Sequence, residues 1–440
     1  MEDAYIITGG KKLIGEVMLS GAKNIALKVI IAALMFESEV TLTNIPRIQD
    51  IHELIHLLEL LGVKIDFTGN TVIINPKNIS SNKVDLLHAS KIRVSFLLFA
   101  PLLHTFGAAI IPNPGGCRLG ARSIDRVIDG LRALGVHVEY DSQTGYYNAL
   151  MKEAPSGEYR FEKPSHTGTE LMIMMSVFGA GLITLKNVAQ EPEIDDLISM
   201  LNESGARIKR VGVDIEVEGV EKLVQHKPFH ISADRVEAAT YAVAGIASGG
   251  SVTISSIQEH FIKSFNDAII RVGAKVENLG HGTWRYIVTT PMQAIDIETA
   301  PYPGFLTDWQ PLFAVLMTQT DGKSAIHERI FENRFSYVDE LRRLGAKIEY
   351  IEKNVANPKE HYHFNYDTKK QYAQTIEISG PQKLHGGVLT VSDLRAGATL
   401  VIAALIAENE SYVKGVSHIS RGYENFIEKI QGLGGEIREI

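Results

Sequence analysis

Leu61-Gly62-Val63-Lys64-Ile65 decides how this chain is expected to fold, because the same kind of turn occurs six times. In each copy a glycine follows a helical pattern and precedes a short strand that carries a charge. Glycine adopts the left-handed backbone that commonly ends a helix, so each glycine is expected just past one. The spacings between the six glycines are 73, 70, 68, 72 and 89 residues. The glycines are Gly62, Gly135, Gly205, Gly273, Gly345 and Gly434.

Each repeated unit also contains an earlier helical pattern that is apolar on nearly all sides. Such a helix is expected to be buried, with sheets and more polar second helices packed outside it. Stretches rich in β-formers, such as residues 39–45 and 181–188, follow these patterns and predict strands. The six apolar helices are predicted over residues 24–36, 95–103, 170–178, 236–247, 309–317 and 396–407.

Six units of this size are too many for one hydrophobic core, so we expect two α/β domains of three units each. The first domain is predicted over residues 22–232. The second combines residues 1–21 with residues 233–440, because the strand expected over residues 5–19 has no unit of its own. Turns near Gly21 and near Ala233-Asp234 are the expected crossings between the domains.

The composition excludes several classes of function. The 52 acidic residues outnumber the 44 basic ones, and the net charge of −8 argues against a nucleic-acid-binding surface. A single cysteine excludes an internal disulfide and indicates a reducing compartment. The chain has neither a signal-peptide pattern at its start nor an apolar run of about 18 residues. We therefore expect a cytoplasmic protein without a membrane partner, while the oligomeric state stays open.

The single cysteine lies in Gly115-Gly116-Cys117-Arg118-Leu119-Gly120-Ala121-Arg122. A lone cysteine is often only a small buried hydrophobe. Here, however, a strand is predicted before the loop and a helix after it, and Arg118 and Arg122 favour a thiolate. A strand-to-helix connection also directs backbone N–H groups at an anion. The stretch is therefore a candidate reactive loop.

Six blocks of sequence carry a resemblance to a known family. They are Ser20-Gly21-Ala22-Lys23-Asn24, the loop from Gly116 to Arg122, Gly304-Phe305-Leu306-Thr307-Asp308-Trp309-Gln310, Ile330-Phe331-Glu332-Asn333-Arg334-Phe335, Ser392-Asp393-Leu394-Arg395-Ala396 and Arg421-Gly422-Tyr423-Glu424. In this order they closely resemble the UDP-N-acetylglucosamine 1-carboxyvinyltransferases, which are enolpyruvyl transferases. The resemblance runs from about Gly15 to the C-terminus.

The resemblance implies a fold and a reaction. The fold is two inside-out α/β barrel domains, each of three similar units, with the active site in the cleft between them. The reaction moves the enolpyruvyl group of phosphoenolpyruvate to the 3-hydroxyl of UDP-N-acetylglucosamine and releases phosphate, as the first committed step of peptidoglycan synthesis. No cofactor and no metal ion is expected.

The resemblance also assigns catalytic roles. Cys117 is implied as the general acid and as the target of an epoxide inhibitor such as fosfomycin, and Asp308 as the base near the sugar hydroxyl. From the residues alone, Asp308 is instead a candidate N-cap of the helix that follows. Lys23, Arg122 and Arg421 are implied to grip the phosphate of phosphoenolpyruvate, and Arg334 and Arg395 to neutralise nearby charge.

Further residues are implied to bind the nucleotide sugar. Arg93 is implied to contact the diphosphate and Asn24 to hold the sugar. The remaining substrate-binding candidates are Ser123, Ile124, Asp125, Lys163, Ser165, Phe331, Glu332, Asp393 and Leu394. Two segments depart from the family pattern: Arg126 follows the loop, and His166 replaces a small apolar residue. Both segments line the uridine end, so these changes indicate either tolerated variation or a paralogue with another nucleotide substrate.

Three other functions compete with this interpretation. The stretch His52-Glu53-Leu54-Ile55-His56 matches the zinc-peptidase pattern, although Ile51, Leu54, Ile55 and Leu58 predict an ordinary outer helix there. The sister activity, enolpyruvylshikimate-phosphate synthase, uses a Lys-Ser pair where this chain has Lys23-Asn24, and does not use the cysteine. A non-catalytic binding homologue would not require both the acid and the base.

Overall fold

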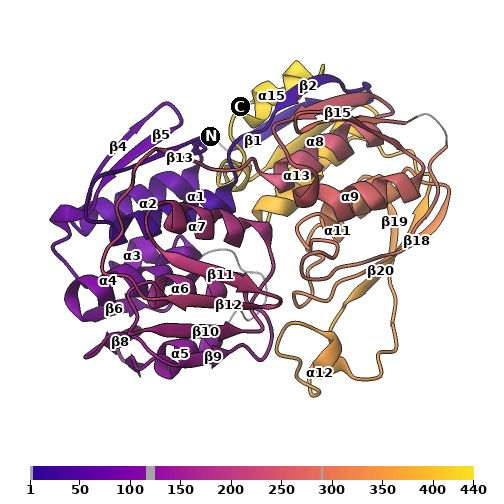
Figure 1. Ribbon diagram of the computed structural model, residues 1–440. Helices are drawn as coiled ribbons and strands as arrows, with labels where there is room; N and C mark the ends of the chain where they lie inside the picture. The colour runs from indigo at the N-terminus through magenta and orange to yellow at the C-terminus, as the bar shows by residue number, and fades with distance from the viewer. Residues whose placement is uncertain (1–2, 115–123, 289–290) are drawn as a thin grey trace. The chain divides into compact units, whose positions relative to one another are not determined.

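The computed structural model describes residues 3–114, 124–288 and 291–440, and their contacts divide them into two compact units (Figure 1). The N-terminal unit comprises residues 21–114 and 124–232. The C-terminal unit comprises residues 3–20, 233–288 and 291–440. Each unit has a hydrophobic core of its own.

Three sheets surround the core of the N-terminal unit, and in all three the strands are short. Their strand orders are β13-β3-β5-β4, β6-β8-β7 and β11-β12-β10-β9. The strands are β3 (Val40–Thr43), β4 (Lys64–Thr68), β5 (Thr71–Asn75), β6 (Ala108–Pro112), β7 (His137–Asp141), β8 (Tyr146–Leu150), β9 (Glu158–Arg160), β10 (Leu182–Lys186), β11 (Arg207–Val211), β12 (Asp214–Glu218) and β13 (Phe229–His230).

The C-terminal unit has three further sheets, with orders β15-β16-β14-β2, β17-β18-β20-β19 and β21-β22-β1-β23. Their strands are β1 (Ala4–Thr8), β2 (Ile14–Met18), β14 (Ser251–Ser255), β15 (Lys275–Gly280), β16 (Thr283–Ile287), β17 (Ile297–Glu298), β18 (Gly322–His327), β19 (Lys347–Tyr350), β20 (Thr375–Gly380), β21 (Val388–Thr390), β22 (Glu410–Lys414) and β23 (Glu436–Glu439).

Four of the six sheets in the described residues repeat one topology. An antiparallel hairpin pairs with the first strand of its unit, and a short parallel segment covers the edge of that strand. Residues 5–19 were expected as one strand but form two, which complete two different sheets of the C-terminal unit. β1 pairs with β22 and β23, and β2 pairs with β14.

The apolar helices lie in the two cores as expected, because they have no polar side to place in water. α8 (Arg235–Ala247) and α10 (Gln310–Met317) are buried at every residue. The other inner helices are α1 (Lys23–Ala32), α4 (Phe99–Phe106), α6 (His166–Ser176) and α13 (Leu394–Ile406), and α1 and α4 are extended by the 3₁₀ turns η1 (Ala33–Met35) and η3 (Arg93–Leu98).

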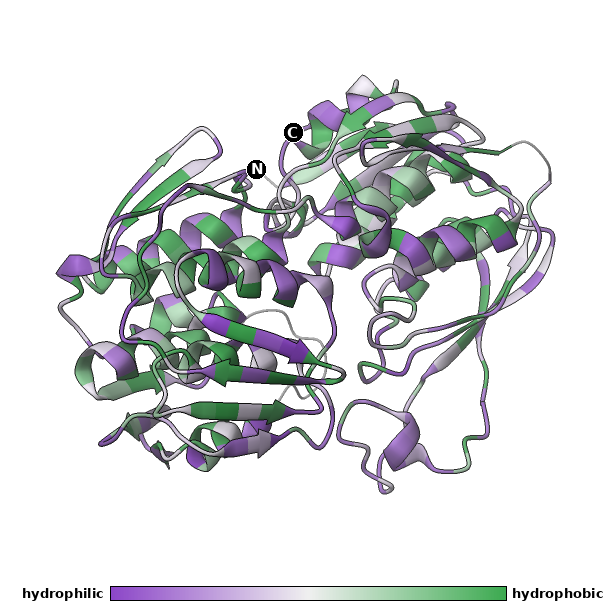
Figure 2. Cartoon of the chain, viewed as in Figure 1, coloured by the Kyte–Doolittle hydropathy of each residue, from purple (hydrophilic) through white to green (hydrophobic). Residues whose placement is uncertain are grey.

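Amphipathic outer helices end at the six repeated glycines, which all have the left-handed backbone that the sequence predicts, with φ between 87° and 107°. The outer strands alternate in burial, and purple and green bands alternate along β11 and β12 in Figure 2. The outer helices are α2 (Gln49–Leu60), α5 (Asp125–Ala133), α7 (Pro192–Glu203), α9 (Glu259–Val272), α11 (Val338–Arg343) and α15 (Phe426–Gly432).

One hairpin departs from the repeat. In the hairpins β4–β5, β11–β12 and β15–β16 only two residues join the strands, whereas residues 351–374 join β19 to β20. This excursion carries α12 (Pro358–His361) and extends from the sheet at the lower right of Figure 1. It accounts for the longest glycine spacing. The remaining short helices are η2 (Pro76–Asn78), α3 (Leu86–Ala89) and α14 (Ser417–Ser420).

Candidate active site

Asp308 is held between two arginines of the C-terminal unit. Arg334 Nη2 donates to Asp308 Oδ1 at 2.6 Å, and Arg395 Nε lies 3.5 Å from Oδ2. The arginine side chains are 4% and 8% exposed, whereas that of Asp308 is 22% exposed. Charge-assisted bonds of this kind are strong and orient both partners. Three residues predicted from separate blocks of sequence therefore share one cluster.

Thr307 binds Arg334 directly, and Glu328 binds Thr307 in turn. Arg334 Nη1 donates to Thr307 Oγ1 at 2.7 Å, and the Thr307 hydroxyl donates to Glu328 Oε2 at 2.7 Å. Burial raises the pKa of the fully buried Glu328 carboxyl, and Arg334 opposes that rise. Burial lowers the pKa of Arg334, but Asp308 outweighs it and the pKa is raised. We call Thr307, Asp308, Glu328, Arg334 and Arg395 the Asp308 cluster.

Arg395 is the second residue of α13, and Asp393 is the N-cap residue of this helix. Asp393 Oδ1 accepts hydrogen bonds from the backbone N–H groups of Arg395 and Ala396 at 2.9 and 3.0 Å. The Arg395 guanidinium carbon lies 5.5 Å from the centre of the Tyr423 ring. Among the described residues, Arg395 Nη1 is buried and has no hydrogen-bond partner. A buried N–H that is left unpaired is costly, so this donor suits an anionic ligand.

Close packing keeps the segment of Arg421 beside the start of α13. Gly422 touches Leu394, since a Cβ at position 422 would lie 2.6 Å from Leu394 Cδ2. Arg421 itself is the C-cap residue of α14 and is partly exposed.

The Phe331 ring lies against Arg334, with 5.2 Å between the ring centre and the guanidinium carbon. The next residue, Glu332, is partly buried.

The interpretation of Asp308 as an N-cap is wrong. α10 begins at Gln310, its N-cap residue is Trp309, and no side chain caps it. A capping oxygen bonds to the second or third N–H of a helix, and Pro311 occupies the second position without an N–H group. The Asp308 carboxylate is instead bound to the two arginines.

Lys23 and Asn24 begin α1 in the N-terminal unit. Lys23 Nζ lies 2.6 Å from Asp50 Oδ2, and the two side chains are 12% and 8% exposed. Asn24 is partly buried. Arg93 is the first residue of η3 and is also partly buried. The start of α1 thus offers a lysine together with helix N–H groups, which is a suitable arrangement for an anion.

The residues predicted for the uridine end lie at two helix starts of the same unit. Ile124 is the buried N-cap residue of α5, and Asp125 follows it as an exposed first residue. Ser165 caps α6, its Oγ accepting a hydrogen bond from Gly168 N–H at 3.3 Å. Burial lowers the pKa of the Lys163 ammonium, and the positive charge of Arg126 lowers it further.

Three predicted residues, Cys117, Arg122 and Ser123, lie outside the described residues. Their roles stay predictions from the sequence.

Known proteins match this chain over nearly its whole length. The family model of EPSP synthase (3-phosphoshikimate 1-carboxyvinyltransferase) matches residues 7–430. The chain belongs to the EPSP synthase family. A UDP-N-acetylglucosamine 1-carboxyvinyltransferase of Desulfosudis oleivorans is 36% identical over 100% of this chain and 99% of its own. One of Prochlorococcus marinus subsp. pastoris is 38% identical over 98% and 90%. This family member is therefore a transferase enzyme.

Solved structures show the same fold. The enolpyruvyl transferase NikO from Streptomyces tendae superposes with a TM-score of 0.85 at 21% identity, covering 100% of this chain and 99% of its own. EPSP synthase from Acinetobacter baumannii superposes with a TM-score of 0.70 at 17% identity, over 99% and 100%. The predicted enolpyruvyl transferase fold is confirmed. Within the described residues, the structure contains no helix with the length and apolar character of a membrane span.

The zinc-peptidase pattern lies on α2 of this transferase, as the outer-helix interpretation predicts. His52 and His56 are exposed, and their rings lie against Phe67 and His88, while Glu53 binds Lys91 at 2.9 Å. The described residues that could hold a metal ion together do not include this pattern. The buried stripe of α2 contains Ile51, Leu54, Ile55 and Leu58.

A second buried charge cluster went unnoticed in the sequence. Lys28 Nζ and His166 Nε2 each lie 3.2 Å from Glu170 Oε1, between α1 and α6 of the N-terminal unit. Lys28 and Glu170 are 4% and 0% exposed. Burial lowers the pKa of His166, but Glu170 outweighs burial and the pKa is raised. The available signal was a lysine in the middle of an apolar helix. We call these three residues the Glu170 cluster.

Proposed function

We propose that this enzyme transfers the enolpyruvyl group of phosphoenolpyruvate to the 3-hydroxyl of UDP-N-acetylglucosamine and releases phosphate. The relatives named for this activity span nearly the full chain at 36% and 38% identity. The observation that carries the proposal is the Asp308 carboxylate between Arg334 and Arg395. It combines a proton acceptor with two cations, and enolpyruvyl transfer to a hydroxyl needs both.

The addition step has two proton transfers, which we assign to two residues, and the elimination step that follows has one more. The sugar hydroxyl attacks C2 of phosphoenolpyruvate and gives up its proton to Asp308, while Cys117 delivers a proton to the methylene carbon C3. C3 then loses a proton and the C2–O bond to phosphate breaks, which restores the vinyl group on the sugar oxygen. The bond from Arg334 at 2.6 Å fixes the orientation of the Asp308 carboxylate for the first step.

The anionic groups of phosphoenolpyruvate require several cations. We assign its phosphate to Lys23, Arg122 and Arg421, and its carboxylate to Arg395, whose Nη1 is a buried donor with no partner among the described residues. A guanidinium fork binds a carboxylate through two parallel hydrogen bonds. Arg395 would then bind Asp308 through Nε and the ligand through Nη1.

Assembly of the site requires both units. Lys23, Asn24, Arg93 and the Cys117 loop belong to the first predicted domain, and Asp308, Arg395 and Arg421 to the second. We therefore propose that residues 22–232 and residues 1–21 with 233–440 are two domains that both contribute residues to the active site. A peptidoglycan precursor and a single cysteine favour a cytoplasmic enzyme.

A different nucleotide acceptor is the second candidate, because Arg126 adds positive charge beside Lys163. His166 argues against it, since the Glu170 cluster gives this side chain a structural partner. The test is phosphate release from phosphoenolpyruvate with UDP-N-acetylglucosamine, beside other nucleotide sugars and shikimate phosphate. We expect turnover with UDP-N-acetylglucosamine. No turnover with it, but turnover with another acceptor, would assign the change of specificity to the segments of Arg126 and His166.

A further inference from the structure

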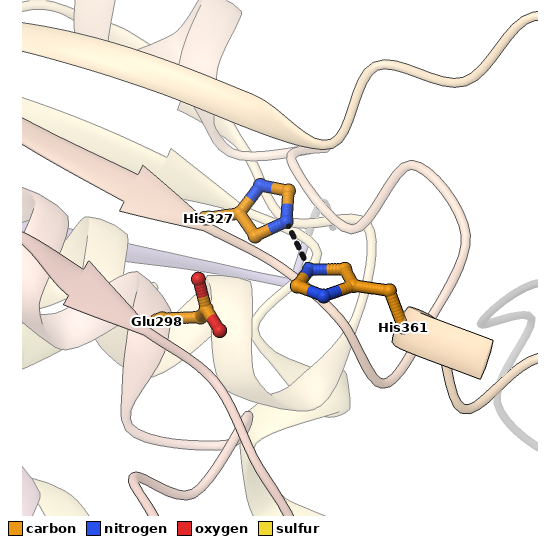
Figure 3. A group of neighbouring side chains, drawn as sticks. All are labelled: Glu298, His327 and His361. Carbon is orange, nitrogen blue, oxygen red and sulfur yellow. Dashed lines mark hydrogen bonds between the residues drawn. The ribbon is translucent and has the colours of Figure 1, made fainter. Parts of the chain in front are cut away.

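Glu298, His327 and His361 form a group of metal-ligating side chains in the C-terminal unit, in a place that the reaction does not use (Figure 3). Glu298 ends β17 and His327 ends β18, and these two residues are register partners in a parallel pair. Register partners place their side chains on the same face of a sheet. His361 comes from the excursion, where it ends α12.

The three side chains offer converging ligand atoms. His327 Nε2 lies 3.0 Å from His361 Nε2, and the ligand atoms of all three residues lie within 4.8 Å of one another. We propose that Glu298, His327 and His361 bind a divalent first-row transition-metal ion that fastens the excursion to its sheet. Two imidazoles and one carboxylate are ligands that zinc, cobalt, nickel and iron(II) accept.

A hydrogen bond at the other ring nitrogen, Nδ1, orients His327 for this role. His327 Nδ1 lies 2.8 Å from Thr375 Oγ1, so a proton on Nδ1 leaves the Nε2 lone pair directed at His361. His327 is 2% exposed. Burial lowers its pKa to about 4, and burial also lowers the pKa of His361. Metal binding requires the neutral form of both rings.

Glu298 supplies the anionic ligand and retains free lone pairs. Its Oε1 accepts a hydrogen bond from Arg329 Nη1 at 2.7 Å, and its Oε2 accepts one from Lys353 Nζ at 2.8 Å. Burial raises its pKa, but Lys353 and Arg329 outweigh burial and the pKa is lowered. Each carboxylate oxygen has two lone pairs, so one remains on each oxygen for a metal ion. The two cations also oppose a further positive charge, and we expect weaker binding than at an uncompensated carboxylate.

The distance between the two nitrogens indicates the coordination geometry. With metal–nitrogen bonds of about 2.1 Å, a separation of 3.0 Å corresponds to an angle of roughly 90° at the metal. Neighbouring positions of a five- or six-coordinate ion have this angle, whereas tetrahedral positions are farther apart. Water molecules would complete such a shell. Co²⁺ is a useful probe, because its visible absorption is weak in octahedral and strong in tetrahedral sites.

The excursion gives the site a physical purpose. Among the described hairpins, strands that are joined by two-residue turns need no further attachment. Residues 351–374 form a much longer connection, which has to be attached to the sheet. The excursion has an aromatic cluster of its own, in which the Tyr362 ring is stacked on Tyr366 with 5.4 Å between centres. Toward the sheet, His363 N–H donates to Arg329 C=O at 2.8 Å. A metal ion shared by His361, Glu298 and His327 would add a stronger attachment.

Calorimetric titration of the full-length chain with Zn²⁺, after chelator treatment and dialysis, tests the proposal. We expect one site of defined stoichiometry, weakened at least about tenfold in His361→Ala, which removes a partly exposed ligand and keeps the fold. The matched controls are His281→Asn, in an exposed turn where asparagine tolerates the left-handed backbone, and His56→Ala on α2. Both controls should bind Zn²⁺ as the unmodified chain does. Equal binding by His361→Ala, or loss in His56→Ala instead, would overturn the assignment.

A second measurement separates the excursion from adventitious surface binding. Trypsin cleavage after the exposed Lys369 and Lys370 should slow when Zn²⁺ is added to the unmodified chain, and should not change in His361→Ala. When Co²⁺ is added in place of Zn²⁺, the unmodified chain should give a weak visible spectrum of bound Co²⁺, and Glu298→Gln should not. Cleavage that is insensitive to Zn²⁺ in the unmodified chain would contradict the proposed fastening of the excursion.

Discussion

The two buried charge clusters of this enzyme share one arrangement but differ in how far their central carboxylates are buried. In each, one carboxylate is held by two cationic groups: Asp308 by Arg334 and Arg395, and Glu170 by Lys28 and His166. Asp308 and Arg395 lie near the starts of the inner helices α10 and α13, and the Asp308 side chain is 22% exposed. Glu170 lies inside α6 with an exposure of 0%. A ligand can therefore reach the carboxylate of Asp308, whereas the carboxylate of Glu170 is closed to it.

The two clusters also differ in which buried polar atoms lack a hydrogen-bond partner. In the Asp308 cluster a donor is left over, Arg395 Nη1, whereas in the Glu170 cluster both carboxylate oxygens and His166 Nε2 lack a well-directed hydrogen bond. A buried donor next to the partly exposed Asp308 side chain can bind an anion, but the atoms of the Glu170 cluster are held together only by charge. Substitutions in the first cluster should therefore change the rate, and substitutions in the second should change stability.

The largest expected effect is that of Asp308→Asn on turnover. The amide is nearly isosteric and cannot accept the proton of the sugar hydroxyl, so we expect kcat to fall by about 10² to 10⁴. Phosphate release under saturating substrates measures it. Asp267→Asn, which changes an exposed carboxylate paired with Lys263, is the control and should leave the rate unchanged. A variant at Asp308 with undiminished kcat would remove this residue from the chemistry.

Glu170→Gln should have the second largest effect, on the free energy of unfolding. Removing one partner of a buried ion pair leaves the 4% exposed Lys28 ammonium without its charge partner, which costs about 3–5 kcal/mol. Urea unfolding measures the loss. The double variant Lys28→Met with Glu170→Met removes both charges and should recover most of it, since apolar replacement of a buried pair is often neutral. A double variant as unstable as the single one would show that shape, and not charge, matters here.

The repeated fold followed from local rules that act within a few residues. A glycine needed at a left-handed position is visible in one turn of sequence, and all six were found. The apolar helices were also predicted, but α6 begins at His166 rather than Glu170, because its first turn is polar. The excursion was visible only as a longer glycine spacing.

The sites were predicted less completely, for physical reasons. Asp308 was assigned through resemblance, but Thr307, which binds Arg334, and Glu328, which binds Thr307, were not, because these residues meet only when β18 and α10 are in place. Lys28 and Glu170 lie 142 positions apart, and nothing local joins them. The pattern His52 to His56 looks like a metal site at short range, whereas the metal-ligating group that we propose is assembled from three distant segments by strand pairing.

Thr307→Val tests whether the Asp308 cluster depends on the two hydrogen bonds of the Thr307 hydroxyl. Valine keeps the shape but removes the acceptor for Arg334 Nη1 and the donor to the buried Glu328 carboxyl. A buried polar group left unpaired costs about 1–3 kcal/mol, so we expect a loss of stability in this range. Because Arg334 keeps its bond to Asp308, kcat should fall much less than in Asp308→Asn. An equal fall in kcat would mean that Thr307 itself contributes to the chemistry.

The smallest expected effect is a dependence of stability on pH that His166 creates. Glu170 raises the pKa of His166 in the folded chain above the ordinary value of 6.5, so the folded chain retains a proton that the unfolded chain has lost. The stabilisation is complete below pH 6.5 and declines as the pH rises through the folded pKa, with a slope of at most about 1.4 kcal/mol per pH unit. Urea unfolding of the unmodified chain and of His166→Gln between pH 6 and pH 9 measures it, and the difference between the two should shrink toward high pH. A difference for His166→Gln that is independent of pH would show that this histidine is neutral in the core, and that Glu170 is balanced by Lys28 alone.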